Sequence, residues 1–363
     1  MASLVADGHH VRVLDSLTAQ VHGPAARVPA ALAGAEWIAG DIRDAARVRA
    51  ALTEVEAVVH LAAETGVGQS MYEVERYVDV NERGTACLLQ GIIGQGRPVR
   101  LVLASSRAVY GEGRYRCPRC GEVSPPPREV ARLEHALWEP LCPRCGGAID
   151  PVATDEEALP RPGSVYAATK LAQEHLCAIV GNAYGLSTTM LRYFNVYGPG
   201  QSLSNPYTGI LATFAARARG GRAIEIFEDG AEIRDFVFID DVVAATRAAL
   251  LQPVEARQSH VQVLNIGSGV AVTIADLARA MLRVGGWDVP LLVSGAYRVG
   301  DVRHAVADTR RAAQVLGFTA TTALEDGLRR WLAWAADGAY EDGTDGAVAD
   351  LAARGLFRGG GGG

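Results

Sequence analysis

The sequence predicts an α/β fold in which helices cover both faces of a mostly parallel sheet. Segments 57–63 and 99–106 are mostly apolar and end in small or hydroxyl residues, as strands buried on both faces do. Helical patterns follow them, and one of these begins at Ser164. Ligands of such sheets bind outside the carboxyl ends of the strands, so polar residues there are the first candidates for a functional site.

Composition and charge narrow the class of protein. The chain has 363 residues, enough to bury one large domain or two unequal ones. A net charge of -6 gives no basic surface for nucleic acid. No apolar run approaches the ~18 to 20 residues that span a bilayer, and no signal peptide is visible. We therefore expect a cytoplasmic protein with no nucleic-acid or membrane partner.

Tyr166 and Lys170 form a candidate acid/base pair. They are four residues apart in a helical pattern, so they share one face. Using a tyrosine hydroxyl as a base near neutral pH means favouring the phenolate by about three pKa units, roughly 4 kcal/mol. An ammonium ~4 Å away at an effective dielectric of ~20 supplies energy of that size. Such pairs also occur by chance on solvated surfaces, and the hydroxyls of Ser105 and Ser106 could simply end a strand.

The order Ser106, Tyr166, Lys170 resembles the active site of the extended short-chain dehydrogenase/reductases, and the resemblance spans 11–334. It implies that Ser106 hydrogen-bonds the reacting oxygen and Tyr166 moves the proton. Lys170 would hold the nicotinamide ribose and lower the tyrosine pKa. It also implies a Rossmann-like NAD-binding domain over 1–186, a smaller α/β substrate-binding part over 187–340 with some strands returning to the main sheet, and a flexible tail over 341–363.

The resemblance also implies cofactor contacts. Asp15 ends the second strand, where a carboxylate accepts hydrogen bonds from ribose hydroxyls and disfavours a 2′-phosphate, so NAD is expected over NADP; a turn-forming aspartate is the alternative. Asp41 would contact the adenine segment, or cap a helix, or do both. Asn81 would chiefly tie active-site backbone together, and His60 would be packed rather than a ligand. The remaining implied contacts are Ile42, Leu61, Ala62, Ala63, Ser105, Tyr166, Lys170, Tyr193, Asn195 and Val196.

The beginning departs from the family. Segment 1–8 reads as the end of a helix, and the strand 10–15 follows directly. Relatives open with a strand and a glycine-rich turn, where helix N-terminal amides hold the pyrophosphate. We expect about twenty residues carrying these elements to precede Met1, and without them a gap in the middle of the sheet. The alternative is a variant that does not hold NAD in the usual way.

Two CPRCG motifs predict a structural zinc site in an insertion over 112–155. Each tight turn directs two sulfurs inward, and four thiolates complete a tetrahedral zinc site with no position left for substrate. The other two cysteines sit singly in helical patterns, which suits a reducing compartment. The predicted ligands are Cys117, Cys120, Cys142 and Cys145.

The second half resembles nucleotide-sugar epimerases and dehydratases. In LRYFNVYGP, Asn195 would touch the sugar diphosphate, or it could simply cap the chain. Arg234 would meet a nucleotide phosphate, otherwise pairing on the surface with a nearby aspartate, and Arg303 would be a second arginine at the diphosphate. The full set of predicted substrate contacts is Thr65, Ser106, Arg107, Tyr166, Asn195, Asn205, Thr208, Arg234 and Arg303.

The residues after Ser106 favour one reaction. Dehydratases of the family carry an acidic pair there, whereas this chain has Arg107 and Ala108, and arginine cannot serve as that acid. We therefore expect NAD-dependent inversion of C4 of a nucleotide-diphosphate sugar through a transient 4-keto sugar. Segments 64–70, 201–210 and 297–304, with the insertion, resemble bacterial dTDP-L-rhamnose 4-epimerases.

Other functions stay open at this stage. They are UDP-hexose or UDP-hexuronate 4-epimerisation, 4,6-dehydration with another acid, and non-catalytic binding of a nucleotide sugar. A homodimer formed through the two helices that contain Asn81 and Tyr166 is the expected assembly.

Overall fold

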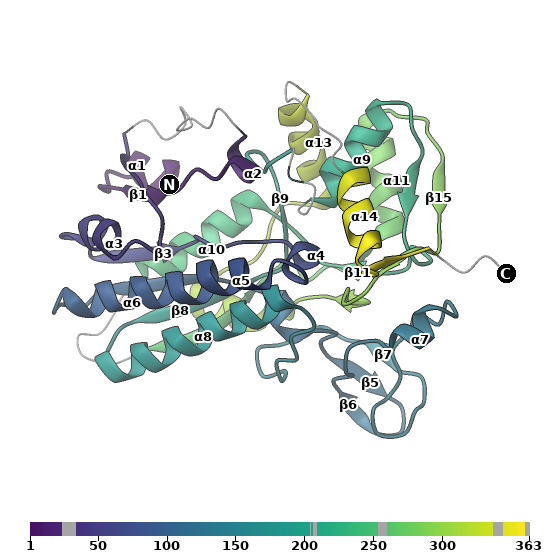
Figure 1. Cartoon of the computed structure of the whole chain (residues 1–363), viewed down its shortest axis with the longest axis horizontal. Helices are drawn as coiled ribbons and strands as arrows, with labels where there is room; N and C mark the ends of the chain where they lie inside the picture. Colours follow the sequence, from purple (N-terminus) through teal and green to yellow (C-terminus); the bar gives the residue numbers. More distant parts are fainter. Residues whose placement is uncertain (24–33, 204, 206–208, 253–259, 337–343, 360–363) are drawn as a thin grey trace.

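A four-stranded parallel sheet in the order β13-β8-β4-β3 lies at the centre of the fold (Figure 1). Its strands are β3 (Ala57–His60), β4 (Arg100–Ser106), β8 (Thr188–Tyr193) and β13 (Val261–Ile266). The register sets Ser106 opposite Tyr193, so the carboxyl ends of neighbouring strands meet at one edge. The computed structural model describes residues 1–23, 34–203, 205, 209–252, 260–336 and 344–359. The predicted parallel α/β fold is confirmed.

A second, two-stranded parallel sheet holds the first part of the chain. It consists of β1 (Arg12–Asp15) and β2 (Glu36–Ala39), and α1 (Ala2–Ala6) precedes it. Within the described residues neither strand is hydrogen-bonded to β3, so the two sheets are separate. This is the gap expected in the middle of a doubly wound sheet.

Two long helices cover one face of the main sheet, where Figure 1 shows α5, α6 and α8 side by side. α5 (Val74–Val78) continues through a π-helical turn (Asp79–Arg83) into α6 (Gly84–Gly94). α8 (Val165–Tyr184) begins where the Ser164 hydroxyl accepts a hydrogen bond from the Ala167 amide. The remaining helices of this half are α2 (Ala19–His22), α3 (Ala45–Leu52), α4 (Val67–Ser70) and the 3₁₀ helix η3 (Arg107–Tyr110).

The other face is covered by α10 (Ile239–Leu251) and α12 (Arg310–Leu316). Beyond the sheet, three amphipathic helices build a second core around the fully buried Trp331. The helices and strands of this half are α9 (Ile210–Arg219), α11 (Ile274–Gly285), α13 (Leu324–Ala335), β9 (Asn195–Tyr197), β10 (Ile224–Ile226), β11 (Ile233–Arg234), β12 (Phe236–Phe238), β14 (Val272–Thr273), β15 (Leu291–Val293), β16 (Tyr297–Arg298) and β17 (His304–Ala305). No helix among the described residues is long and apolar enough to cross a membrane.

The cysteine-bearing insertion forms a small antiparallel sheet that projects from the body of the protein (Figure 1). Its strands, in the order β6-β5-β7, are β5 (Tyr115–Cys117), β6 (Gly121–Val123) and β7 (Asp150–Pro151). A single-turn helix, α7 (Val130–Leu133), lies between the two cysteine pairs. This is the compact module predicted from the paired CPRCG motifs.

The C-terminal segment is structured where the sequence predicted a flexible tail over 341–363. It forms α14 (Thr344–Ala353) and β18 (Phe357–Arg358), and β18 pairs antiparallel with β16. Leu351 on α14 is buried, and its side chain lies directly over Gly68 on α4. The prediction was wrong for the described part, 344–359, because both partners of this segment come from distant parts of the chain.

Candidate active site

Ser106 and Tyr166 meet where β4 ends and α8 begins. The Ser106 hydroxyl also accepts a hydrogen bond from the Ala108 amide at 3.2 Å, which holds the turn into η3. Burial raises the pKa of the Tyr166 hydroxyl above its usual value. A hydrogen bond with Ser106 and the positive charge of Arg107 act in the opposite direction. The structure therefore brings together a hydroxyl pair with a cation beside it.

Lys170 lies one turn further along α8 and is the only lysine in the chain. It is 3% exposed, and its Nζ donates a hydrogen bond to the Ala104 carbonyl at 2.9 Å. Burial lowers its pKa to about 8, against the opposing effect of nearby Cys177 and Glu174. Because the ammonium is directed at β4, the group that lowers the tyrosine pKa by its charge here is Arg107 rather than Lys170.

Asn81, in the π-helical turn, ties two parts of the site together. Its side chain accepts from the Glu64 amide at 2.7 Å and donates to the Glu64 carbonyl and to the Thr169 hydroxyl. It is fully buried, so its partners lie within the chain rather than in a ligand. His60 is likewise packed, hydrogen-bonded to Thr85 at 2.8 Å, and burial lowers its pKa to about 3.

Thr65 is exposed in the loop after β3. The Tyr77 hydroxyl donates to the Thr65 carbonyl at 2.7 Å, and the Tyr77 ring meets the Tyr166 ring edge to face at 6.5 Å. This chain of contacts fixes the loop after β3 next to the catalytic candidates. The Thr65 side chain is thus available to a ligand at Tyr166.

The predicted cofactor residues gather at the carboxyl ends of the strands. Asp15 ends β1 with a half-exposed carboxylate that accepts from the Leu17 amide at 2.7 Å. Leu61 is 54% exposed directly after β3, and Val196 is 39% exposed after β8. A carboxylate at the end of β1 and exposed apolar side chains after β3 and β8 match the ribose and the flat rings of a dinucleotide, so the residues present suit NAD.

Other predicted cofactor residues are engaged within the chain. Asp41 is held by Arg43 at 2.6 Å, which lowers the pKa of Asp41. The Ser105 hydroxyl binds Glu174, which leaves only its backbone for a cofactor. Ile42 packs against Gly84, Ala62 and Ala63 are half-buried, and the Tyr193 hydroxyl binds Thr246.

A group of four arginines surrounds Asp301 on the substrate side of the cleft. Burial alone would raise the pKa of Asp301, but the arginine charges lower it. Burial lowers the pKa of Arg107 to about 10, and repulsion by Arg234 contributes. Arg128 is paired with Glu228, so the Asp301 carboxylate is shared by the other three cations, an arrangement that attracts a polyanion. The arginines are Arg107, Arg128, Arg234 and Arg298.

Arg234 and Asn195, both predicted substrate contacts, lie at this group. Asn195 Oδ1 accepts a hydrogen bond from Arg107 Nε at 3.2 Å, so the two predicted residues are joined. Arg234 donates through both terminal nitrogens to Asp301 and to backbone carbonyls, which leaves Nε as its remaining donor. Asn205 is buried, and Thr208 lies outside the described residues.

The second arginine beside Asp301 is Arg298 and not the predicted Arg303. Arg303 is 1% exposed and is bound by Glu139, Glu228 and Asp229 at 2.7 to 2.9 Å, so it has no donor to offer a phosphate. Among the described residues, the buried Nε of Arg298 has no hydrogen-bond partner, and the guanidinium stacks over the Phe227 ring at 5.0 Å. Both arginines are present in the motif YRVGDVRH, but the sequence alone does not indicate which of them is bound by carboxylates from other parts of the chain.

The four cysteines of the insertion converge, with all their sulfurs within 4.8 Å of one another. Cys117 Sγ and Cys145 Sγ are 3.6 Å apart. Although burial alone would raise the pKa of Cys142, hydrogen bonds from the Arg144 and Cys145 amides lower it to about 6. A compact set of four thiols that includes an easily ionised one fits a tetrahedral thiophilic metal.

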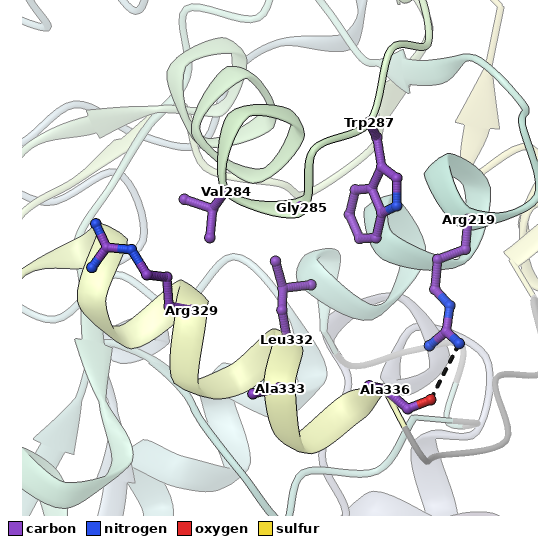
Figure 2. A pocket seen from close by; sticks show the side chains of 8 residues that line it. All are labelled: Arg219, Val284, Gly285, Trp287, Arg329, Leu332, Ala333 and Ala336. Carbon is purple, nitrogen blue, oxygen red and sulfur yellow. Dashed lines mark hydrogen bonds between the residues drawn. The ribbon is translucent and has the colours of Figure 1, made fainter.

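A hollow of about 360 Å³ elsewhere does not belong to this site (Figure 2). It lies between the ends of α9, α11 and α13, where Trp287 and Leu332 line it and Arg219 binds the Ala336 carbonyl. Of the predicted catalytic and binding residues that the structure describes, none lines this hollow. The chemistry therefore lies at the strand ends and not in the hollow.

The parallel sheet, the serine–tyrosine pair on β4 and α8, and the lysine four residues on define an oxidoreductase-type enzyme fold that works with a nicotinamide dinucleotide. A model of the NAD dependent epimerase/dehydratase family matches residues 1–130 and 145–267. The chain belongs to this family.

Similar proteins agree with this assignment. The chain is 42% identical over 327 residues to a dTDP-L-rhamnose 4-epimerase from Burkholderia thailandensis, which covers 89% of this chain and 87% of the relative. Among solved structures, a UDP-glucose 4-epimerase with UDP-glucose from Thermotoga maritima is similar with a TM-score of 0.73 at 27% identity, over 92% of both chains. MoeE5 in complex with UDP-glucuronic acid and NAD is similar with a TM-score of 0.72 at 30% identity, over 93% of this chain and 94% of that one. The chain is therefore related to NAD-dependent sugar-nucleotide epimerases.

Proposed function

We propose that this enzyme inverts C4 of dTDP-L-rhamnose through a transient 4-keto sugar, with NAD as its cofactor. The observation that supports the reaction class is the group of arginines at Asp301 near Ser106 and Tyr166, because it would hold a diphosphate next to an acid/base hydroxyl. The similarity to a dTDP-L-rhamnose 4-epimerase supports this sugar over the UDP-hexoses and UDP-hexuronates.

The chain's own residues would then have distinct roles. Tyr166 takes the proton of the C4 hydroxyl and returns it, and Ser106 holds the same oxygen by hydrogen bonding. Lys170 binds the cofactor ribose, while Arg107 stabilises the tyrosinate by its charge. When bound, NAD supplies a reversible hydride acceptor at the sugar carbon. No further acid or base is needed, because inversion requires only that the keto sugar present its other face.

The cofactor would lie along the strand ends. Asp15 binds the adenosine ribose, Asp41 and Ile42 border the adenine, and residues 61–63 pass beneath the dinucleotide. The apolar side chains exposed at Leu61 and Val196 support this placement. The backbone of Ser105, with Tyr193 and Asn195, would complete the nicotinamide end, and Asn81 would act by holding the loop that carries Thr65.

Substrate would lie against an arginine wall, which is formed by Arg107, Arg234 and Arg298 around Asp301. Arg234, through its free Nε, and Arg298 would bind the diphosphate, with Arg107 and Asn195 at its sugar side. Asn205 and Thr208 follow Asn195 in the sequence and would contact the nucleotide or the sugar.

Dehydration fits this site poorly. It requires an acid near C6 directly after Ser106, where this chain has Arg107, whose pKa of about 10 keeps it charged at pH 7. Glu112, the carboxylate five residues on, is buried and bound by the Arg303 amide at 2.8 Å. It is therefore not free to protonate a leaving hydroxyl.

We further propose a structural zinc ion held by Cys117, Cys120, Cys142 and Cys145, because the four sulfurs converge. A homodimer formed through the continuous α5–α6 helix and α8 is supported by exposed apolar side chains on these helices, among them Val78 on α5 and Ile179 on α8. We place the enzyme in the cytoplasm, and we divide it into a cofactor part over 1–186 and a substrate part over 187–340.

The test is incubation of the purified enzyme with dTDP-L-rhamnose, UDP-galactose and UDP-glucuronate in separate reactions, followed by NMR of the C4 configuration. Inversion of the first with little turnover of the others supports the proposal. Inversion of a UDP-sugar instead would reassign the substrate within the same mechanism. A protein that binds NAD and inverts none of them would contradict the proposed function.

A further inference from the structure

The insertion is attached to the substrate half by buried charges. Arg128, between the two cysteine pairs, has a side chain that is 4% exposed. Its two terminal nitrogens donate to both carboxylate oxygens of Glu228 at 2.8 Å, and one of them also donates to the Asp301 carbonyl at 2.9 Å. Its Nε lies 3.3 Å from Glu112. This guanidinium therefore joins the insertion to the segment that carries the arginine wall.

A second contact reinforces the first. Glu139 of the insertion accepts hydrogen bonds from Arg303 and His304, and Arg303 in turn shares Glu228 with Arg128. Beside these ion pairs, the Trp138 ring packs against the Tyr297 ring at 5.9 Å. Apolar and charged contacts thus fasten the insertion along residues 297–304.

Residues 297–304 have little regular structure of their own. Within them only the two-residue strand β16 and the first residue of β17 are regular. Arg298 and the Asp301 side chain, which binds Arg234 at 3.2 Å, come from the same stretch. The placement of these groups therefore depends on what packs against the stretch, which is β18, paired with β16, together with the insertion.

The cysteine pairs close the loop that carries these contacts. Residues 121–141, which include Arg128, Trp138 and Glu139, leave from one pair and return to the other. A cavity of about 150 Å³ lies where this loop meets the wall, lined by Pro127 and Arg128 on one side and by 299–302 on the other. A metal at the cysteines would hold both ends of the loop, so that the loop packs against residues 297–304 as a rigid unit.

We infer that Arg128 is a positioning residue for substrate binding, and that metal at the four cysteines tightens binding of the nucleoside diphosphate through it. The inference rests on the proposed function, since it assigns the arginine wall to the diphosphate. The insertion would then set affinity for the nucleotide sugar, while the hydroxyl chemistry at Tyr166 proceeds without it.

The experiment compares Arg128→Met, Arg128→Lys and a control, Arg116→Met. Arg116 belongs to the same module but has a side chain 66% exposed at the surface. The readouts are the Kd of dTDP by calorimetry, the metal content, and KM and kcat with dTDP-L-rhamnose. We expect Arg128→Met to raise Kd and KM about tenfold or more, with kcat within about threefold of wild type. Arg128→Lys should recover part of the loss, and the control should match wild type.

Metal removal supplies a second arm. Protein stripped with a chelator and unchanged in far-UV circular dichroism should bind dTDP more weakly than the metal-loaded protein by a similar factor. Re-addition of Zn²⁺ should restore the affinity.

Several results would overturn the inference. One is a folded, metal-loaded Arg128→Met enzyme with wild-type affinity for dTDP. If that variant does not fold, Arg128→Lys decides, because a single ammonium cannot bridge Glu228 and the Asp301 carbonyl as the guanidinium does; wild-type affinity in it counts against the inference. Equal dTDP affinity with and without metal counts against it too. A wild-type enzyme that binds neither dTDP nor UDP would instead contradict the proposed function.

Discussion

Lys170 should titrate far below an ordinary lysine, and the sequence makes this directly measurable. It is the only lysine in the chain, so protein labelled with ε-¹³C-lysine gives one side-chain signal. Burial lowers its pKa to about 8 from the usual 10.5. At about 1.4 kcal/mol per pKa unit, the difference corresponds to about 3 kcal/mol of destabilisation in the cofactor-free protein at neutral pH.

The sign of the effect on stability follows from the two protonation states. Below pH 8 the lysine is charged in both the native and the unfolded chain, so the full penalty of burying the charge is present. Between pH 8 and 10.5 the native group loses its proton while the unfolded one keeps it, so the penalty is relieved as pH rises. This group alone should make the wild-type protein about 2 kcal/mol more stable at pH 9.5 than at pH 7.

The Lys170→Met variant isolates this contribution. It also loses the hydrogen bond to the Ala104 carbonyl, worth ~1.5 to 3 kcal/mol while the lysine is charged, and the change in that bond on deprotonation is already part of the pKa shift. Urea unfolding gives the free energy of unfolding of the cofactor-free wild type and variant at pH 7 and pH 9.5. From the lower to the higher pH, the stability of the wild type relative to the variant should rise by about 2 kcal/mol. A ¹³C titration midpoint near 10.5, or identical pH dependence of the two proteins, would refute the reasoning.

Three further predictions concern single side chains. Tyr166→Phe should lower kcat at least ~10³-fold while NAD content and folding stay unchanged, as measured by turnover and by absorbance of released cofactor. Arg298→Met should raise the Kd of dTDP about tenfold with little change in Tm, whereas Arg303→Met should cost at least ~1.5 to 3 kcal/mol in unfolding experiments because it removes a charged partner of the buried Glu228; equal behaviour of the two would contradict their assignment. Cys145→Ser should lower bound zinc in metal analysis, and a full metal complement in that variant would argue against the four-thiolate site.

Local patterns in the sequence were enough to predict the sheet, the long helix and the four-cysteine cluster. The apolar run before Ser106 and the cap at Ser164 each depend on neighbours within a few residues, so their structure follows from local chemistry. The CPRCG repeats carry their own geometry in the same way. The gap between β1 and β3 was also predictable, because the element expected between them is not in the sequence.

Long-range packing limited the rest. Arg298 and Arg303 are equally plausible in sequence, and only the buried Glu228 and the partly exposed Asp229, some 70 residues earlier, distinguish them by binding Arg303. The C-terminal strand likewise forms because Phe357 pairs with Arg298, which no local pattern announces. The charge that faces Tyr166 was assigned to its helical neighbour, whereas Arg107 on the turn after β4 provides it.

The most direct test of the account is epimerisation of dTDP-L-rhamnose in D₂O, followed by NMR. The account predicts that C4 inverts, that the C4 hydrogen is not exchanged for deuterium, and that no NAD is consumed overall, because the hydride leaves and returns within one active site. Deuterium at C4, or release of the 4-keto sugar with accumulation of NADH, would contradict it.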